Sequence, residues 1–397
     1  MYSPPNFNKT ENENDKHLKI LLFCDASNFH RCLAEGLRKK GHHVVVASDG
    51  NRWMDTERDI DLSRIFNNKI GGALLWIKTK HFLLRKLRGF DIVSISNPTF
   101  PFLKPQRMRY ILKMLRENNR NLFVNALGPD SLYVKASLRN DANLRYNEYY
   151  VDTIPTEFKI RSSQETVRWN DYSLVSLYKE LYESSVGTTT VLYEYDRIWK
   201  TFLSEDKVGY TGIPIDTERI RPVELPDRPA KVKLFLGLKR EHVLEKGTDR
   251  IMAAAKRVSE KFPHLCSLEI VENVPYKEYL ERLKQAHVVL DQLYSYTPAT
   301  NALLAMAYGL NTLSGGEPEF YDFIGENELR PIINAVPDDD ALFNILVEVV
   351  KHPEKIRTRG IKGRRFVEKH HNLNLISSRY LNFWEKNMDR PLQKLNA

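Results

Sequence analysis

LKILLFC, at residues 18–24, is an apolar run with the length of a buried strand. A helical stretch over residues 30–40 follows it and ends at Gly41, and HVVVA at residues 43–47 is a second apolar run. Runs without polar alternation are typical of parallel strands that are covered on both faces. Strand, helix and strand at this spacing predict a βαβ unit with parallel strands.

The same alternation continues through the first half of the chain and starts again at KVKLFLG, residues 231–237. Further strands are predicted at residues 91–96, 121–125, 267–271, 288–291, 311–314 and 331–334. Further helices are predicted at residues 105–118, 172–184, 249–262, 276–285, 300–308 and 374–386. We therefore predict an α/β protein with two Rossmann-like, doubly wound domains that face each other across a cleft.

The length of 397 residues supports two domains, because one core rarely serves more than roughly 250–300 residues. We predict a disordered tail at residues 1–17 and a first domain over residues 18–212. Residues 213–230 are rich in proline and are predicted to be a linker that carries the hinge. The second domain is predicted over residues 231–373, and the helix at 374–386 is expected to pack back on the first domain.

Composition narrows the class of protein. The chain is 42% hydrophobic and 28% charged, and no apolar run approaches the ~20 residues that span a bilayer. The first residues lack the apolar core of a secretory signal, so we expect a cytoplasmic protein. Cys24, Cys32 and Cys266 are too scattered for a disulfide framework or a zinc site, and we expect no metal and no cofactor.

A net charge of +9 favours anionic partners such as nucleic acid, acidic lipid or a nucleotide-linked substrate. No motif of aromatic and basic residues supports nucleic-acid binding. KTKHFLLRKLRGF, at residues 78–90, is basic and amphipathic. Such a stretch either touches an anionic membrane or packs its apolar face on the sheet. The sequence therefore leaves two alternatives for this stretch, a peripheral contact with the membrane and packing on the sheet.

Polar residues follow the first strand, and ligands of open parallel sheets bind beyond the carboxyl ends of the strands. DASNFH, at residues 25–30, has no glycine and so is not the G-x-G-x-x-G fingerprint of a dinucleotide site. Its side chains can bond sugar hydroxyls, and helix capping is the alternative. We predict an acceptor site from these and later loop residues: Asp25, Ser27, Asn28, Ser96, Asn97 and Asp130.

The loop over residues 237–249 carries Lys239, Arg240 and Lys246 between a strand and a helix. Cations beside the amino end of a helix suit a diphosphate, because they add positive charge to unpaired backbone N–H groups. We predict that these three residues bind the diphosphate of a nucleotide-sugar donor. A solvated basic loop is the alternative.

YSYTPATN, at residues 294–301, precedes another predicted helix. Thr300 or Asn301 is expected to cap that helix, so that its first amides face the cleft and bind an anion. Thr297 joins them in the predicted donor site.

SGGEPEF, at residues 314–320, follows the next strand. Gly315 and Gly316 permit close approach of the backbone to a ligand, and Glu317 and Glu319 supply carboxylates for sugar hydroxyls. These four residues complete the predicted donor site, with a Gly-Gly turn and exposed acids as the alternative.

Several of these segments resemble the retaining glycosyltransferases of family 4, a group with many lipopolysaccharide and capsule enzymes. YTGIPID at residues 210–216 looks like the domain connector of that family, and Lys246–Gly247 like its phosphate loop. AMAYG at residues 305–309 is similar to its helix end, and the glycine loop at 314–319 is in the corresponding place. DIVSISNP at residues 91–98 is similar to a strand-end motif.

The resemblance implies the GT-B fold and metal-independent transfer of a sugar, with retention, from a nucleotide sugar to a saccharide or lipid-linked acceptor. It further implies a role in cell-surface polysaccharide biosynthesis, at the inner face of the cell membrane. It assigns no catalytic residue. Tyr296 and Leu304 stand where the family has two glutamates, and Ser94 and Ser96 where it has histidines. A sugar-nucleotide epimerase on the same fold and a non-catalytic sugar-binding or partner-binding protein are the alternatives.

Overall fold

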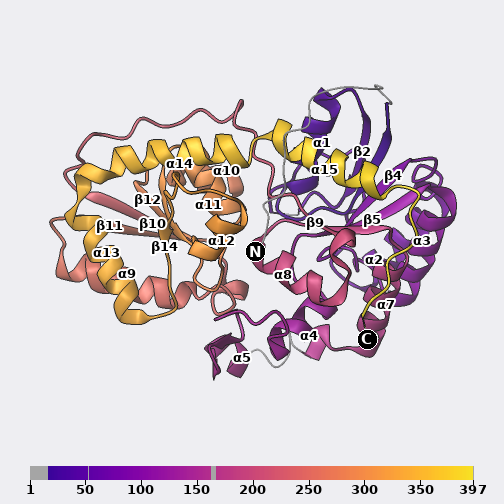
Figure 1. Ribbon diagram of the computed structural model, residues 1–397, viewed down its shortest axis with the longest axis horizontal. Helices are drawn as coiled ribbons and strands as arrows, with labels where there is room; N and C mark the ends of the chain where they lie inside the picture. Colours follow the sequence, from indigo (N-terminus) through magenta and orange to yellow (C-terminus); the bar gives the residue numbers. More distant parts are fainter. Residues whose placement is uncertain (1–16, 52, 162–166, 397) are drawn as a thin grey trace.

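The protein has two lobes, each built on a sheet of parallel strands (Figure 1), in a computed structural model that describes residues 17–51, 53–161 and 167–396. The first sheet has the strand order β3-β2-β1-β4-β5-β8-β9, and the second has the order β11-β10-β12-β13-β14. Every pairing within these two sheets is parallel. The predicted fold class, two Rossmann-like doubly wound units, is confirmed.

The strands of the N-terminal lobe are β1 (Lys19–Phe23), β2 (His43–Ser48), β3 (Ile60–Asp61), β4 (Ile92–Ser96), β5 (Asn121–Ala126), β8 (Gly187–Thr190) and β9 (Val208–Tyr210). A separate hairpin pairs β6 (Tyr150–Val151) with β7 (Ile154–Pro155). The strands of the C-terminal lobe are β10 (Val232–Leu238), β11 (Cys266–Glu272), β12 (Val288–Leu290), β13 (Asn311–Ser314) and β14 (Ile333–Asn334).

The helices of the N-terminal lobe are α1 (Phe29–Lys39), α2 (Lys69–Lys78), α3 (Pro105–Asn118), α4 (Ser131–Arg139), α5 (Glu157–Arg161), α7 (Tyr172–Glu183) and α8 (Tyr193–Phe202). Those of the C-terminal lobe are α9 (Thr248–Lys261), α10 (Tyr276–Leu283), α11 (Thr300–Ala307), α12 (Pro318–Phe323), α13 (Asp339–Lys351) and α14 (Ile356–His370). The last helix is α15 (Leu373–Asn387). Shorter turns are η1 (Thr79–Leu83), η2 (Glu205–Lys207), η3 (Arg240–His242) and η4 (Pro353–Lys355).

Strand β1 lies inside the first sheet, between β2 and β4, and both of its faces are apolar. It pairs with β2 through Ile20 and Val44, and with β4 through Leu21 and Val93. From Ile20 to Phe23 no side chain is exposed. Helices on the two faces of the sheet exclude water from the whole strand, as expected for a continuous apolar run.

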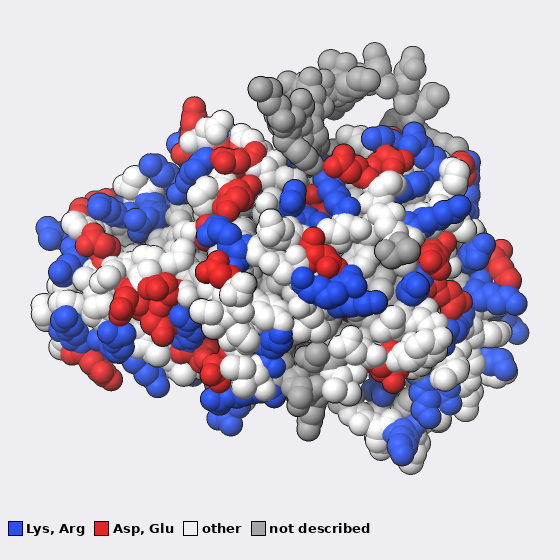
Figure 2. Space-filling view, turned by 60° about the horizontal axis from the view of Figure 1, so that its bottom comes forward, with Lys and Arg blue, Asp and Glu red and all other residues white. Residues whose placement is uncertain are grey.

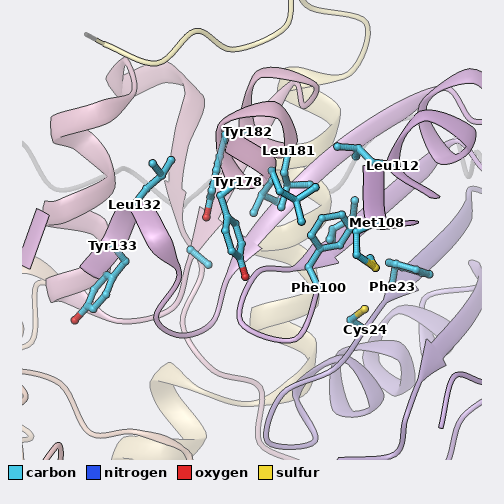
Figure 3. Close-up of a cluster of buried hydrophobic side chains, with 14 of the residues drawn as sticks. Phe23, Cys24, Phe100, Met108, Leu112, Leu132, Tyr133, Tyr178, Leu181 and Tyr182 are labelled. Carbon is cyan, nitrogen blue, oxygen red and sulfur yellow. The ribbon is translucent and has the colours of Figure 1, made fainter. Parts of the chain in front are cut away.

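One part of the N-terminal core lies between α3 and α7 (Figure 3). Tyr178 and Leu181 of α7 belong to the same buried cluster as Met108 and Leu112 of α3, together with Phe100 from the preceding loop. α7 begins at a cap, where the Asp171 side chain accepts from the backbone N–H of the first turn. The helix that was predicted at residues 172–184 therefore contributes directly to the core of the first lobe.

Helix α15 leaves the C-terminal lobe and lies on the N-terminal lobe, against α1 and β8 (Figure 1). Its Tyr380 hydroxyl donates to Asn125 on β5 over 2.7 Å. A methyl group on Gly209 would overlap the ring of Phe383, so the absence of a side chain there lets the helix approach the sheet. The end of the chain thus stabilises the lobe that contains its beginning.

The chain crosses between the lobes twice, and the two crossings are bonded to each other. Ile215 donates its N–H to the carbonyl of His371 over 2.8 Å, and His371 Nδ1 lies 3.0 Å from the carbonyl oxygen of Ile213. The segment over residues 213–230 has no helix or strand assigned to it. Its role as a hinge and the domain boundaries stay predictions.

The structure also differs from the sequence-based expectations. Strands β3, β8 and β9 and helices α2, α4 and α8 were not predicted, and several of them are too short or too polar to show a clear period. Within residues 78–90, the expected apolar face is buried against the lobe at Leu83, Leu84 and Leu87. The predicted tail at residues 1–17 lies outside the described residues except for His17. Among the helices of the described chain, none is long and apolar enough to cross a bilayer.

Candidate functional site

Two of the predicted donor loops meet at the carboxyl ends of β10 and β12. Leu293 donates its N–H to the carbonyl oxygen of Lys246 over 2.8 Å, which joins the loop after β10 to the segment that leads into α11. Gly247 has φ 64°, and a Cβ atom there would lie 2.8 Å from the Cβ atom of Leu293. Both the left-handed backbone and the close approach therefore require glycine next to Lys246.

The three predicted cations of the β10 loop are not equivalent. Arg240 is paired with Glu272, and Lys239 lies 3.6 Å from Glu241. Lys246 is exposed and has no carboxylate within ion-pair distance among the residues that the structure describes. Of the three, Lys246 is therefore the cation most available to an anionic ligand.

The start of α11 lacks a side-chain cap, which corrects the expectation for Thr300 and Asn301. The capping position is Ala299, and Thr300 is the first helical residue. Asn301 instead donates to Asp291 over 3.1 Å and accepts from the Tyr279 hydroxyl over 2.7 Å. Because no side chain of the described residues caps the first-turn N–H groups, they are left for water or for an anionic ligand.

The glycine loop after β13 packs against its own lobe. A Cβ atom on Gly315 would overlap the carbonyl oxygen of Ser295, and one on Gly316 would lie 2.8 Å from Ile332. Gly316 also donates its N–H to Asn334 over 2.9 Å. We expected these glycines to lie close to a ligand. In this structure they lie close to other residues of the same lobe instead.

The two carboxylates of that loop contact the N-terminal lobe. Arg145 donates to Glu317 over 2.6 Å and to Glu319 over 3.0 Å. The Tyr146 hydroxyl donates to Glu317 over 2.7 Å, and its ring stacks on Tyr296 at a centroid distance of 4.7 Å. Burial alone would raise the pKa of Glu317, but hydrogen bonds from Asn334, Tyr146 and Arg145 hold that pKa below its usual value. Glu317 is therefore a buried, ionised group.

A second contact between the lobes involves Thr297. Glu194 of α8 accepts from the Ser295 hydroxyl over 2.5 Å and from the Thr297 hydroxyl over 2.7 Å. Thr297 Oγ1 in turn accepts from the N–H of Tyr193 over 3.0 Å. Thr297 is completely buried, so this predicted donor residue is engaged with the opposite lobe.

Aromatic rings make a third contact. Trp53, in the loop after β2, donates its indole N–H to the carbonyl of Val274 over 2.8 Å. Its ring lies edge-on to those of Tyr276 and Tyr279, at centroid distances of 5.0 and 5.6 Å. The sequence analysis missed Trp53, Arg145, Tyr146 and Glu194, because none of them belongs to a motif and their partners lie more than 100 residues away.

The predicted acceptor residues near β1 have different surroundings. Asp25 is buried and accepts from the backbone N–H of His30 over 2.8 Å, so among these loop residues it has the capping role that was the alternative to ligand binding. Ser27 is exposed and Asn28 is half-buried, and both have positive φ. Of these three residues, only Ser27 and Asn28 offer surface to a ligand in this structure.

The other three predicted acceptor residues are fully buried. Asn97 donates to Asp130 over 2.8 Å, and the Tyr182 hydroxyl donates to the same carboxylate over 2.7 Å. Ser96 lies 2.9 Å from the hydroxyl of Thr99. Asp130 also caps α4 through the N–H groups of its first turn. The structure thus brings Asn97 and Asp130 together, in a network that supports the ends of β4 and β5.

Comparison with solved structures shows similarity along nearly the whole chain. Sucrose-phosphate synthase from Thermosynechococcus elongatus has a TM-score of 0.58 at 14% identity, covering 93% of this chain and 98% of that one. HepE from Anabaena, solved with UDP and glucose, has a TM-score of 0.54 at 10% identity, covering 93% and 100%. A Listeria monocytogenes protein provisionally named UDP-N-acetylglucosamine 2-epimerase has a TM-score of 0.52 at 10% identity, covering 94% and 98%.

The chain has the GT-B fold. No protein-family model matches it. No curated protein sequence matches it. At 10–14% identity, the similarity between the GT-B structures lies in the backbone and leaves the chemistry to be argued from this chain's own residues.

At two positions this GT-B chain has a residue type that differs from that of the family that the sequence resembles. Tyr296, in place of a glutamate, accepts through its hydroxyl from the N–H of Arg145 over 2.7 Å. Leu304, in place of the second glutamate, lies on α11. The candidate site therefore consists of Lys246, the start of α11, and the cross-lobe group of Arg145, Tyr146, Tyr296, Glu317 and Glu319.

The pH dependence of stability can test whether His30, in the turn after β1, is buried. Its Nδ1 contacts the carbonyl of Cys24 and its Nε2 lies 3.2 Å from Asn125. Burial lowers the pKa of His30 to about 4. Between pH 6.5 and 4 the unfolded chain therefore binds a proton at His30 that the folded chain does not. This proton uptake lowers the free energy of unfolding by up to about 3 kcal/mol as pH falls. We expect the free energy of unfolding of wild type, measured by urea titration, to fall relative to that of His30→Gln by about this amount between pH 7 and pH 4.

The comparison with His30→Gln is needed because Asp25 acts in the opposite sense. Burial raises the pKa of Asp25 to about 7, so this carboxyl favours the folded state as pH falls. Both proteins contain Asp25, and the difference between them isolates His30. A difference that stays constant from pH 7 to 4 would contradict the placement of a buried neutral imidazole.

Proposed function

We propose that this protein is a glycosyltransferase that moves a sugar from a nucleotide-sugar donor to a saccharide or lipid-linked acceptor. The observation that carries the proposal is the hydrogen bond between the Lys246 loop and the segment that leads to the uncapped start of α11, at the carboxyl edge of the second sheet. A cation and free helix-end amides form a site for a diphosphate. The similarity to HepE, which was solved with UDP and glucose, supports a nucleotide sugar as the ligand.

In the proposed reaction the bond between the anomeric carbon and the diphosphate oxygen breaks, and an acceptor hydroxyl bonds to that carbon. The electron pair of the broken bond leaves with the nucleoside diphosphate, and the hydroxyl proton passes to solvent. Lys246, with Lys239 and Arg240, would neutralise the charge that develops on the leaving diphosphate. The reaction needs no redox partner, and we propose that it proceeds with retention, as in the family that the sequence resembles.

The sugar of the donor would bind near Glu317 and Glu319. In the present conformation both carboxylates are held by Arg145. Sugar hydroxyls can replace guanidinium N–H groups as donors only if Arg145 moves with the N-terminal lobe. The proposal therefore includes a separation of the lobes when the donor enters, at the hinge predicted over residues 213–230.

The acceptor would approach from the N-terminal lobe, where Ser27 and Asn28 are accessible after β1. We propose a cytoplasmic enzyme of cell-surface polysaccharide biosynthesis that works at the inner face of the cell membrane. The net charge of +9 supports an anionic donor and an anionic surface as partners, in preference to nucleic acid.

A thermal-shift screen against nucleotide sugars and free nucleoside diphosphates tests the proposal. A ligand at about 100 times its Kd stabilises the folded state by roughly 2.7 kcal/mol, which raises the Tm by several degrees. We expect UDP- or another nucleoside-diphosphate sugar to do so, and transfer of labelled sugar when acceptor saccharides are added. If neither nucleotide sugars nor nucleoside diphosphates raise the Tm, the donor site is excluded.

The same assays separate the two alternatives. The similarity to the provisionally named 2-epimerase favours donor conversion without an acceptor, and an isomerised donor with no transferred product would identify it. Tyr296 and Leu304, in place of glutamates, favour a protein that binds without turnover. A raised Tm with neither conversion nor transfer would identify that protein.

A further inference from the structure

A row of large apolar side chains lies exposed on the N-terminal lobe, along α2 and the segments on either side of it. These side chains are 41–75% exposed. The members of this row, here called the α2 stripe, are Ile65, Phe66, Ile70, Leu74, Ile77 and Phe82. Ile70, Leu74 and Ile77 have helical spacing and share one face of α2. Single exposed apolar residues are common in proteins, but a continuous row marks an interaction surface.

The local structure holds the stripe outward. Asn68 caps α2 by accepting from the N–H of Gly71 over 3.0 Å. A Cβ atom on Gly71 would overlap the backbone of Phe66, so this glycine lets the loop with Ile65 and Phe66 pack on the first turn. The loop with Ile65 and Phe66 therefore lies directly against the helix that carries the rest of the stripe.

The opposite face of α2 anchors the helix to the lobe. Leu75 is buried, and the ring of Trp76 lies edge-on to that of Tyr110 on α3 at 5.4 Å. Arg107 donates to the carbonyl of Gly72 over 3.0 Å and lies over the Trp76 ring. With its inner face already packed, α2 does not need the stripe for folding.

The chain segment that carries the stripe is rich in cations. Between Leu62 and Phe90 the chain has seven Lys and Arg residues and no Asp or Glu. Lys78 lies 3.5 Å from Asp61. Five others have no ion-pair partner within the part of the chain that the structure describes: Lys69, Lys80, Arg85, Lys86 and Arg88. In Figure 2, blue Lys and Arg atoms are numerous on this lobe, at the right of the view, with red Asp and Glu atoms among them.

We propose that the α2 stripe docks this protein on the surface of an anionic lipid bilayer. The apolar side chains would enter the boundary between headgroups and acyl chains, and the surrounding cations would meet anionic headgroups. This surface overlaps only in part with the stretch over residues 78–90 that the sequence analysis considered. Phe82 belongs to both, whereas Leu83, Leu84 and Leu87 of that stretch are buried. The docking does not depend on the proposed glycosyl transfer.

Charge favours a membrane over a second copy of the chain. In a symmetric dimer built on the stripe, each set of unpaired cations would face or flank its identical counterpart. Like charges brought close together disfavour such an interface. An anionic bilayer instead offers negative charge around an apolar interior, which matches the arrangement on the protein.

Flotation of the full chain with lipid vesicles tests the inference. We expect binding to vesicles of phosphatidylcholine mixed with phosphatidylglycerol, weaker binding to phosphatidylcholine alone, and a decrease as salt is raised. One variant removes the apolar face: Ile70→Ser, Leu74→Ser and Ile77→Ser. Another removes cations: Lys69→Gln, Lys80→Gln and Lys86→Gln. We expect the second to lower the partition coefficient on the order of 100-fold, and the first by at least about tenfold.

Matched controls lie on the other lobe. Ile361→Ser replaces an isoleucine of similar exposure on α14. A charge-matched control combines Lys256→Gln, Lys277→Gln and Lys362→Gln, all exposed lysines. Both controls should bind vesicles as wild type does, and thermal unfolding should show that every variant is folded.

Three results would overturn the inference. The first is wild-type protein that stays unbound with anionic vesicles at low salt. The second is a stripe variant that floats as well as wild type. The third is wild-type protein that dimerises through the stripe in sedimentation without vesicles, which would assign the surface to a protein partner. Because no sugar or nucleotide is added, none of these results bears on the proposed transfer reaction.

Discussion

Replacing Lys246 with alanine is expected to lower kcat/KM for sugar transfer by roughly 10²–10³-fold. Lys246 is the exposed, unpaired cation of the β10 loop, and its backbone is bonded to the segment that leads to the uncapped start of α11. Removing it would leave the departing diphosphate with less positive charge at the moment when its negative charge increases. Because the side chain is exposed, the folded structure should be unaffected.

The measurement is initial-rate kinetics with the nucleotide sugar that the thermal-shift screen identifies. Lys256→Ala is the matched control, since Lys256 is an exposed lysine on α9, the helix that follows the Lys246 loop. Lys246→Arg should recover part of the rate because it keeps the charge. If Lys246→Ala turns over the donor as fast as Lys256→Ala does, Lys246 has no part in the reaction and the proposed diphosphate site is elsewhere.

Replacing Trp384 with alanine is expected to destabilise the protein by about 3–5 kcal/mol, the usual range for a fully buried large aromatic side chain. Trp384 lies on α15 in the same buried cluster as Leu22 and Phe123 of the first sheet. Its ring centroid is 6.1 Å from that of Phe123 and 5.1 Å from that of Tyr380. The cavity would loosen the only described helix that follows the return crossing at residue 371.

Urea unfolding followed by circular dichroism measures this effect. Glu385→Ala is the control, because Glu385 is the next residue on the same helix and is exposed. Its free energy of unfolding should change by less than about 0.5 kcal/mol. With two lobes, unfolding can occur in more than one step, and the expected loss applies to the transition of the N-terminal lobe. Equal stabilities for the two variants would show that α15 does not hold that lobe together.

Much of the fold follows from local sequence pattern. The runs at residues 18–24, 43–47 and 231–237 are apolar enough to be buried on both faces, and each is a strand within one or two residues of its expected ends. Strands such as β8, GTTT, could not be predicted in this way, because threonine becomes buried there only through neighbouring elements, which include β5, β9, α8 and α15.

In the candidate site, too, the sequence pattern predicts the positions of some residues but not their contacts. Chain position alone placed Lys246 after β10 and Glu317 after β13, since loops at the carboxyl ends of parallel strands share one edge of a sheet. The contacts of Glu317 could not be read in this way. Its partner Arg145 is 172 residues away, in a segment without regular alternation.

The amino-acid sequence by itself determined two doubly wound lobes, the order of their strands along the chain, and the loops that carry cations and carboxylates, because hydrophobic period and chain direction are local properties. Only the tertiary structure decided which of those groups are free. Arg145 covers Glu317, Asp25 caps a helix and the α2 stripe faces outward because burial and hydrogen bonding depend on residues that are distant in the chain.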